Sequence, residues 1–323
     1  MLQPIADGGS DIEAVDSRRR HRSVLVYLFV TYAFTWLLWV PPLLDALPRG
    51  WAMPSPDQYA HLAAEGFSGT WHVLLAAAFS IAVYGPLLGA LIATGYERGR
   101  QGVRDLLAWA FNPRVAPRWY LVALIIAIAL SYVPILLAWM TGNVGTPLLD
   151  TGTRLALFVP LLVLQLLTSG LGEEPGWRGY LLPRLQDRFS PVRTVWLLGL
   201  AWAVWHYPLT AIYALSAVPA DAPAPAGVIT IIVALLSQTI GSIGLTYLYV
   251  WLFNRTHSLF LMIVFHALTN VLPFLVSPAL GPWALVVGVF PWIVVLVLWL
   301  VTRGNFWRSE ALPDAAPQRP QQT

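Results

Sequence analysis

Two adjacent acids at the end of a long apolar run are the most unusual feature of this sequence. Glu173 and Glu174 follow the apolar run 154–171 and directly precede Pro175. A carboxylate at membrane depth costs roughly 2.5–3.5 kcal/mol on insertion scales, so an acid in such a place suggests a function by default. General base catalysis is the chemistry that a buried carboxylate offers most readily. The alternative is a pair of solvated acids that caps a helix at the membrane face.

The residues around the two acids indicate different roles for Glu173 and Glu174. Neighbours on an α-helix point about 100° apart, so Glu173 and Glu174 need not share a role. Arg178 lies four residues after Glu174 and could pair with it, which would keep one acid ionised while the other serves as a general base. Pro175 lacks a backbone donor, so we expect the helix to break or kink there and to expose polar backbone in a cavity.

Two histidines lie inside further apolar runs. Trp202 precedes His206 by one helical turn, where its indole could fix the orientation of the imidazole. His266 and Asn270 are also four residues apart, and on one helix face they would resemble paired donors for a developing oxyanion. Purely structural alternatives exist for each: a histidine satisfied by a backbone carbonyl, and an asparagine that joins two helices.

The composition is that of a membrane protein. Hydrophobic residues make up 57% and charged residues 11% of the chain, against about 45–50% and about 25% in soluble domains. The absence of cysteine excludes disulfides, thiolate catalysis and cysteine-based zinc sites. All 19 basic residues are arginines spread along the chain rather than gathered in one block, so we expect no nucleic-acid partner and a lipid bilayer as the surroundings.

The hydropathy pattern predicts an all-α, polytopic bundle of about eight transmembrane helices. A spanning helix needs about 20 mostly apolar residues. Eight runs meet this requirement, at 23–44, 71–96, 118–141, 154–173, 192–213, 227–253, 258–276 and 281–301. We expect a tight turn around 277–282 and a single transmembrane domain over 23–303 with its catalytic core at about 154–276. We also expect a disordered cytoplasmic tail at 1–22 and a cytoplasmic tail at 304–323, disordered from residue 313 onward.

Arginine placement predicts the orientation of this bundle. With the N-terminus in the cytoplasm and eight spans, all of the arginines except Arg49 and Arg154 fall on the cytoplasmic side. Both termini are therefore expected to be cytoplasmic. The two acids then lie at the cytoplasmic end of the fourth span, so the site should open toward the cytoplasm.

Taken together, three short motifs resemble those of the CAAX-type intramembrane proteases, the CPBP family. They are Glu-Glu-x-x-x-Arg at 173–178, aromatic-x-x-x-His at 202–206 and His-x-x-x-Asn at 266–270. Trp202 stands where prenyl-protein endopeptidases of the family usually have Phe, which resembles the bacterial branch. The resemblance implies a peptide hydrolase whose site residues are Glu173, Glu174, Arg178, His206, His266 and Asn270.

The family assigns a role to each of these residues. Glu173 would activate water with the assistance of His206, while His266 and Asn270 would stabilise the oxyanion. Glu174 and Arg178 would hold the loop and tune Glu173. The expected activity is endopeptidase cleavage of a membrane-associated protein or peptide near the cytoplasmic face of the cell membrane.

Two other functions and a second chemistry remain open from the sequence. A non-proteolytic member of the family could serve as an immunity or partner-binding membrane protein, and a proton-coupled transporter could use Glu173, His206 and His266 as a relay. The same three residues are also an admissible zinc set with one open position, which would make the enzyme a metalloprotease. The residue inventory favours a glutamate-dependent protease with no required cofactor, because Glu173 as a ligand would leave little to act as base.

Overall fold

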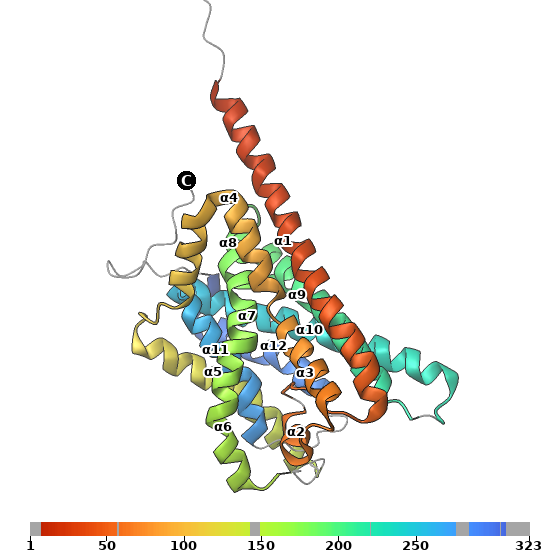
Figure 1. Cartoon of the computed structure of the whole chain (residues 1–323). Coiled ribbons are helices and arrows are strands. Elements are labelled where there is room, and N and C mark those ends of the chain that lie inside the picture. The colour runs from red at the N-terminus through yellow and green to blue at the C-terminus, as the bar shows by residue number, and fades with distance from the viewer. Residues whose placement is uncertain are drawn as a thin grey trace, which may run out of the picture.

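Helices make up all the regular structure of the described residues. The computed structural model describes residues 8–56, 58–142, 149–219, 221–275, 284–303 and 305–307, and no strand occurs among them. The all-α prediction is therefore confirmed. Figure 1 shows the helices gathered around a central green column, which is made by the segment that carries both glutamates.

The N-terminal half supplies five helices. They are α1 (Gly8–Ala46), α2 (Tyr59–Glu65), α3 (Thr70–Ala82), α4 (Gly85–Ala110) and α5 (Pro117–Met140), with the short 3₁₀ helix η1 (Leu47–Arg49) after α1. Helices α3 and α4 meet at a 45° bend. This bend lies beside the glutamates, as the packing described below shows.

The C-terminal half begins with a composite helix. It consists of α6 (Thr151–Gln165), η2 (Leu166–Gly170), α7 (Leu171–Glu174), η3 (Pro175–Leu181) and α8 (Leu182–Gln186). The remaining elements are α9 (Pro191–Ser216), α10 (Ala224–Thr256), α11 (Leu259–Val271), η4 (Leu272–Leu275), α12 (Ala284–Val301) and η6 (Asn305–Trp307). Both η2 and η3 are π-helical, so the composite helix carries two wide turns that enclose α7.

Several helices are long and apolar enough to cross a membrane. Five of the described helices meet this requirement, or six if the bent pair of α3 and α4 counts as one span. Two shorter apolar helices, Leu259–Leu275 and Gly288–Val301, coincide with the last two predicted runs. The chain is therefore a multi-pass membrane protein, while the count of eight spans and the cytoplasmic position of both termini stay predictions.

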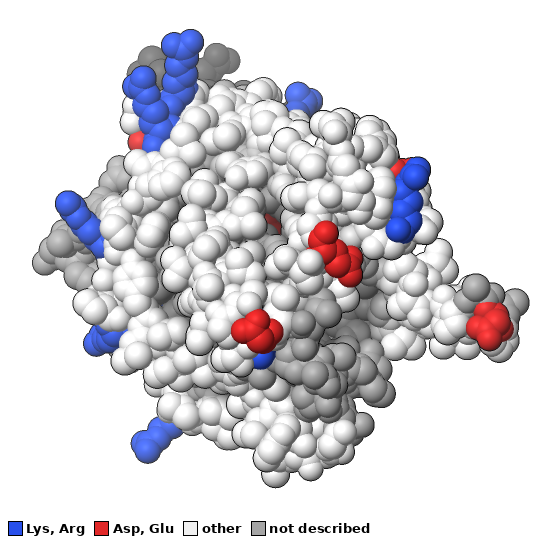
Figure 2. Space-filling view, turned by 60° about the horizontal axis from the view of Figure 1, so that its bottom comes forward, with Lys and Arg blue, Asp and Glu red and all other residues white. Residues whose placement is uncertain are grey.

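The outer surface matches this assignment. Large apolar side chains such as Phe29 and Leu37 are 75% and 71% exposed. In Figure 2, uncharged residues cover most of the visible face, and the charged side chains form separate spots rather than one continuous field. Such a surface is suited to contact with lipid rather than with water.

Close backbone contact joins α1 to α4. A Cβ atom at Gly85 would lie 2.7 Å from the carbonyl oxygen of Thr31, and one at Gly89 would lie 2.8 Å from that of Tyr27. Only glycine fits at such distances, as at small-residue interfaces between membrane helices. Helix α9 likewise packs along α10, and α10 packs along α12.

The ends of the chain differ in part from the predicted tails. Helix α1 begins at Gly8, so residues 8–22 are helical, where the sequence suggested disorder. In the predicted C-terminal tail, residues 305–307 form η6 and its Phe306 is buried. The predicted turn at 277–282, residues 1–7 and residues 308–323 lie outside the described residues.

Candidate active site

The two glutamates lie in α7, between the two π-helical turns. Glu173 is 3% exposed and Glu174 is fully buried. The chain continues as one 36-residue helix from Thr151 to Gln186, so the break expected at Pro175 is not present. Pro175 is the first residue of η3. A π turn is wider than an α turn, which gives the proline ring room beside the preceding turn and keeps the helix continuous.

Glu174 is held by two cationic or polar partners. Arg178 Nη1 donates to Glu174 Oε1 at 3.0 Å, and both side chains are fully buried. His266 Nδ1 lies 2.7 Å from the same oxygen. A carboxylate oxygen only accepts, so Nδ1 carries the proton. The pair of Glu174 with Arg178 that the spacing suggested is therefore formed, and it is joined by a histidine from α11.

Arg178 lies between two aromatic rings. Its guanidinium carbon is 4.4 Å from the centre of the Trp202 ring and 3.8 Å from the centre of the Tyr249 ring. Cation–π contact of this kind is worth about 2 kcal/mol or more where the cation is desolvated. Tyr249 is 1% exposed and comes from α10, and the sequence analysis did not single it out.

Glu173 is oriented from α9 and α11. The indole Nε1 of Trp202 donates to Glu173 Oε2 at 2.9 Å. The other carboxylate oxygen, Oε1, lies 3.8 Å from His266 Nε2. The indole also packs edge-on against the ring of His206, with centres 5.6 Å apart, so the contact expected between the two rings is present and the bond to Glu173 is an additional role. Trp202 and Arg178 are therefore separate partners of the two acids, while His266 lies near both.

His206 is oriented by the backbone of Trp202. Its Nδ1 lies 2.9 Å from the Trp202 carbonyl oxygen, which can only accept, so Nδ1 carries the proton. In the neutral ring the other nitrogen, Nε2, is then an acceptor. Trp205 packs edge-on against the imidazole, with ring centres 4.7 Å apart. No hydrogen bond or ion pair joins His206 to Glu173 within the described part of the chain.

Asn270 follows His266 by one turn on α11 and has a partner that the sequence analysis missed. Asn270 Nδ2 donates to Gln165 Oε1 at 2.7 Å. Gln165 is 3% exposed at the end of α6. An amide inside an otherwise apolar run was a signal available in the sequence, because intramembrane polar side chains need partners.

The predicted zinc set consists of Glu173, His206 and His266. Among the described residues, no three His, Cys, Asp or Glu side chains form a group that could hold a metal ion. Each histidine has one nitrogen held by a fixed partner, an orientation that metal ligands also use. The choice between a zinc-dependent and a metal-free site stays a prediction.

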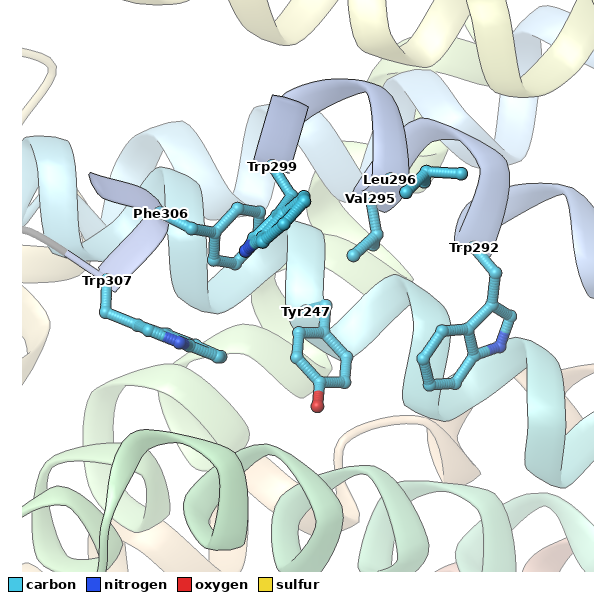
Figure 3. Close-up of a pocket in the computed structure, with 7 residues that line it drawn as sticks. All are labelled: Tyr247, Trp292, Val295, Leu296, Trp299, Phe306 and Trp307. Atoms are coloured by element: carbon cyan, nitrogen blue, oxygen red, sulfur yellow. The ribbon is translucent and has the colours of Figure 1, made fainter. Parts of the chain in front are cut away.

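An aromatic pocket lies away from these residues. Its volume is about 230 Å³, and it is lined by Tyr247, Trp292, Val295, Leu296, Trp299, Phe306 and Trp307. Figure 3 shows these side chains between α10, α12 and η6. Neither glutamate nor either histidine of the site contributes to it, so we do not place the chemistry there.

Comparison with known proteins identifies the segment that carries the site. Residues 155–272 match the family described as Type II CAAX prenyl endopeptidase Rce1-like. The chain is also 48% identical over 52 residues to CAAX prenyl protease 2 of Methanococcus maripaludis, which is 16% of this chain and 19% of the relative. The chain thus matches about a fifth of the length of that relative. All six site residues predicted from the sequence lie inside the segment matched by the family.

Proposed function

We propose that this chain, a CPBP-family protein by its Rce1-like segment at 155–272, is an intramembrane endopeptidase. Its substrate would be a membrane-associated protein or peptide, cleaved near the cytoplasmic face of the cell membrane. Trp202 replaces the Phe that is usual in prenyl-protein endopeptidases, so the proposal does not require a prenylated substrate.

One observation supports the proposal most strongly. Glu173 is a nearly fully buried carboxylate with one oxygen fixed by an indole and the other directed toward a histidine. Burying an acid in an apolar span is costly, and a purely structural acid is expected to be compensated by close cationic partners. Glu174 has two close partners on Oε1, Arg178 at 3.0 Å and His266 at 2.7 Å, whereas Oε1 of Glu173 lies at a longer distance of 3.8 Å from His266.

In the proposed reaction Glu173 acts as the general base. Its carboxylate accepts a proton from water, the water oxygen attacks the peptide carbonyl carbon, and the carbonyl oxygen becomes anionic. The amide nitrogen then leaves with a proton returned by Glu173, which breaks the C–N bond. His206 assists by accepting a hydrogen bond from the water at Nε2, the nitrogen left free by its bond to the Trp202 carbonyl.

His266 and Asn270 stabilise the anionic oxygen. His266 donates from Nδ1 to Glu174, so Nε2 would donate only from the doubly protonated ring. That form also balances the charge of the cluster, because Arg178 and a protonated His266 together neutralise the two buried carboxylates. Removal of one oxyanion donor typically costs about 2.7–4 kcal/mol of transition-state stabilisation, which is the effect expected of Asn270→Ala.

The proposed activity can be tested in cells. We expect membrane proteins from cells with the wild-type chain to carry new C-termini that are absent when the cells carry Glu173→Gln. Quantitative proteomics of C-terminal peptides measures this difference. Equal C-terminal profiles at matched protein levels would favour the non-proteolytic immunity or partner-binding role. If the C-terminal profiles are equal and vesicles with the wild-type protein show a proton flux that vesicles with Glu173→Gln lack, a transporter would be favoured.

Removal of metal tests the choice between a glutamate-dependent and a zinc-dependent enzyme. We expect purified protein to keep its activity after treatment with a strong chelator in nanodiscs, because the proposed chemistry uses Glu173 and His206 alone on the attacking water. The rate of peptide cleavage before and after treatment is the measurement. Activity that disappears and returns only with zinc, with one equivalent of bound metal by elemental analysis, would establish the metalloprotease instead.

A further inference from the structure

Gln165 links two elements that are far apart in the sequence. Its Nε2 donates to the hydroxyl of Tyr59 on α2, and its Oε1 accepts from Asn270 on α11. The Gln165 side chain is buried at the junction of α6 and the π-helical turn η2. Both polar ends of this amide are therefore used inside the helix bundle.

A third contact favours one direction of the Gln165 amide. Thr168 Oγ1 donates to the Leu164 carbonyl at 2.7 Å, so that hydroxyl can only accept from other groups. Gln165 Nε2 lies 3.4 Å from Thr168 Oγ1 and supplies a donor there. A reversed amide would direct Oε1 at an oxygen without a free proton. Gln165 therefore presents Oε1, an acceptor, to Asn270.

The direction of the Asn270 amide follows from that of Gln165. Because Gln165 Oε1 is an acceptor, Asn270 must direct its NH₂ group toward it. One N–H of Asn270 Nδ2 donates to Gln165 Oε1 at 2.7 Å. The same nitrogen keeps a second N–H. If the amide turned by 180°, its oxygen would take the place of that donor and would repel an anionic oxygen.

We propose that Gln165 is a positioning residue that keeps the amide nitrogen of Asn270, rather than its oxygen, available to the carbonyl oxygen of the substrate. This inference rests on the proposed peptidase function. Gln165 touches neither the water nor the peptide bond in this account, and it acts only through Asn270. Its effect should therefore appear in the chemical step and should depend on the presence of Asn270.

The test uses purified full-length protein in nanodiscs and a double-mutant cycle. Gln165→Leu keeps a similar volume and removes all three hydrogen bonds of the amide. We expect kcat to fall by about 10- to 100-fold, less than the roughly 10²–10³-fold typical of complete loss of an oxyanion donor, with KM within about twofold of wild type. In an Asn270→Ala background the same substitution should cost nothing further, because the residue that it positions is gone.

The chain offers a matched control. Gln186 Nε2 donates to Asn254 Oδ1 at 2.8 Å, which is a similar amide pair outside the site. Gln186→Leu should leave kcat near wild type, and thermal unfolding of each variant reports its structural cost. If Gln165→Leu does not fold, Gln165→Met replaces it, because the flexible Met side chain tolerates core sites well.

Three outcomes would contradict this inference. They are an unchanged kcat in Gln165→Leu, a loss that persists in full without Asn270, and a loss of equal size in Gln186→Leu. A wild-type protein that cleaves no peptide would instead contradict the proposed function. The two failures are therefore distinguished in the same set of assays.

Discussion

Trp202 contacts more of the candidate site than any other residue that we describe. Its indole N–H binds Glu173, its backbone carbonyl holds His206, and its ring lies against the guanidinium of Arg178. The ring also approaches His266 edge-on, with centres 6.0 Å apart. The side chain of Trp202 thus orients Glu173, the proposed base, and its backbone carbonyl orients His206, which assists.

Trp202→Phe separates these contributions. Phenylalanine keeps an aromatic face against Arg178 and leaves the backbone carbonyl in place, but it cannot donate to Glu173. A hydrogen bond to a charged group contributes about 1.5–3 kcal/mol, so we expect kcat to fall by roughly 10- to 100-fold. The rate of peptide cleavage by purified protein, with thermal unfolding to verify folding, provides the measurement.

Trp251→Phe is the matched control for this change. Trp251 is also buried, and its indole nitrogen has no hydrogen-bond partner among the described residues. The same chemical change there should leave cleavage near the wild-type rate. Full activity of Trp202→Phe, or an equal loss in both variants, would show that the indole bond to Glu173 has no special importance.

At the scale of residues, contacts within one helix could be predicted from sequence spacing, whereas contacts between helices could not. The pair of Glu174 and Arg178 could be predicted because residues four apart on a helix are neighbours. The bonds from Trp202 to Glu173 and from Asn270 to Gln165 join residues that are 29 and 105 positions apart. They depend on which helix faces are in contact, and no local pattern in the sequence encodes that.

At the scale of elements, one glycine in α7 and one in η3 allow close approach by neighbouring helices. A Cβ at Gly172 would lie 2.7 Å from the carbonyl oxygen of Val83, at the junction of α3 and α4. A Cβ at Gly176 would lie 2.5 Å from the carbonyl oxygen of Pro86. The helical segment that carries the two glutamates therefore packs closely against the bend between α3 and α4. Pro175 suggested a break here, and no local sequence pattern indicates the wider π-helical turns that avoid it.

Gly176→Ala tests the importance of this contact. The added methyl would meet rigid backbone, and overpacking costs typically about 1–3 kcal/mol, more than the about 0.5–1 kcal/mol that alanine gains over glycine in a helix. We expect a lower thermal midpoint and slower cleavage, because a shift of η3 also moves Glu173 and Glu174. Thermal unfolding and cleavage rate are measured on the same preparation.

Gly95→Ala provides the comparison on α4. A Cβ at this position would meet only Val103 Cγ2 at 3.7 Å, an ordinary contact. This variant should therefore be as stable as wild type or slightly more stable. If Gly176→Ala behaved in the same way, the close approach to Pro86 would have no energetic consequence.

At the scale of the whole molecule, composition and hydropathy were sufficient for the class of protein. The predicted runs fall on helices over most of their described length, with the run 71–96 divided between α3 and α4, because a spanning segment must satisfy its own backbone hydrogen bonds. The extent of α1 was not predicted, since polar composition suggested a disordered tail and the structure has helix from Gly8. The cytoplasmic orientation rests on arginine bias and stays a prediction.

A partly buried network away from the site was also missed from the sequence. Glu97 on α4 accepts hydrogen bonds from Ser23, Tyr180 and Arg184, which joins α1 and the end of the composite helix. These bonds hold the end of the composite helix, which carries the glutamates, against α1 and α4. The sequence alone placed Glu97 only near the end of an apolar run.

In the proposed mechanism, Glu173 activates the water that cleaves the peptide bond. The most direct test of this role is the rate at which purified protein in nanodiscs hydrolyses a peptide found by the comparison of cellular C-termini. We expect Glu173→Gln, which keeps the shape of the side chain, to lose at least the roughly 10²–10⁴-fold that acid–base catalysis contributes, with an unchanged thermal midpoint. Glu65→Gln, at an exposed acid of α2, should retain the wild-type rate. Hydrolysis by Glu173→Gln at the full wild-type rate would contradict the role of Glu173 as the general base.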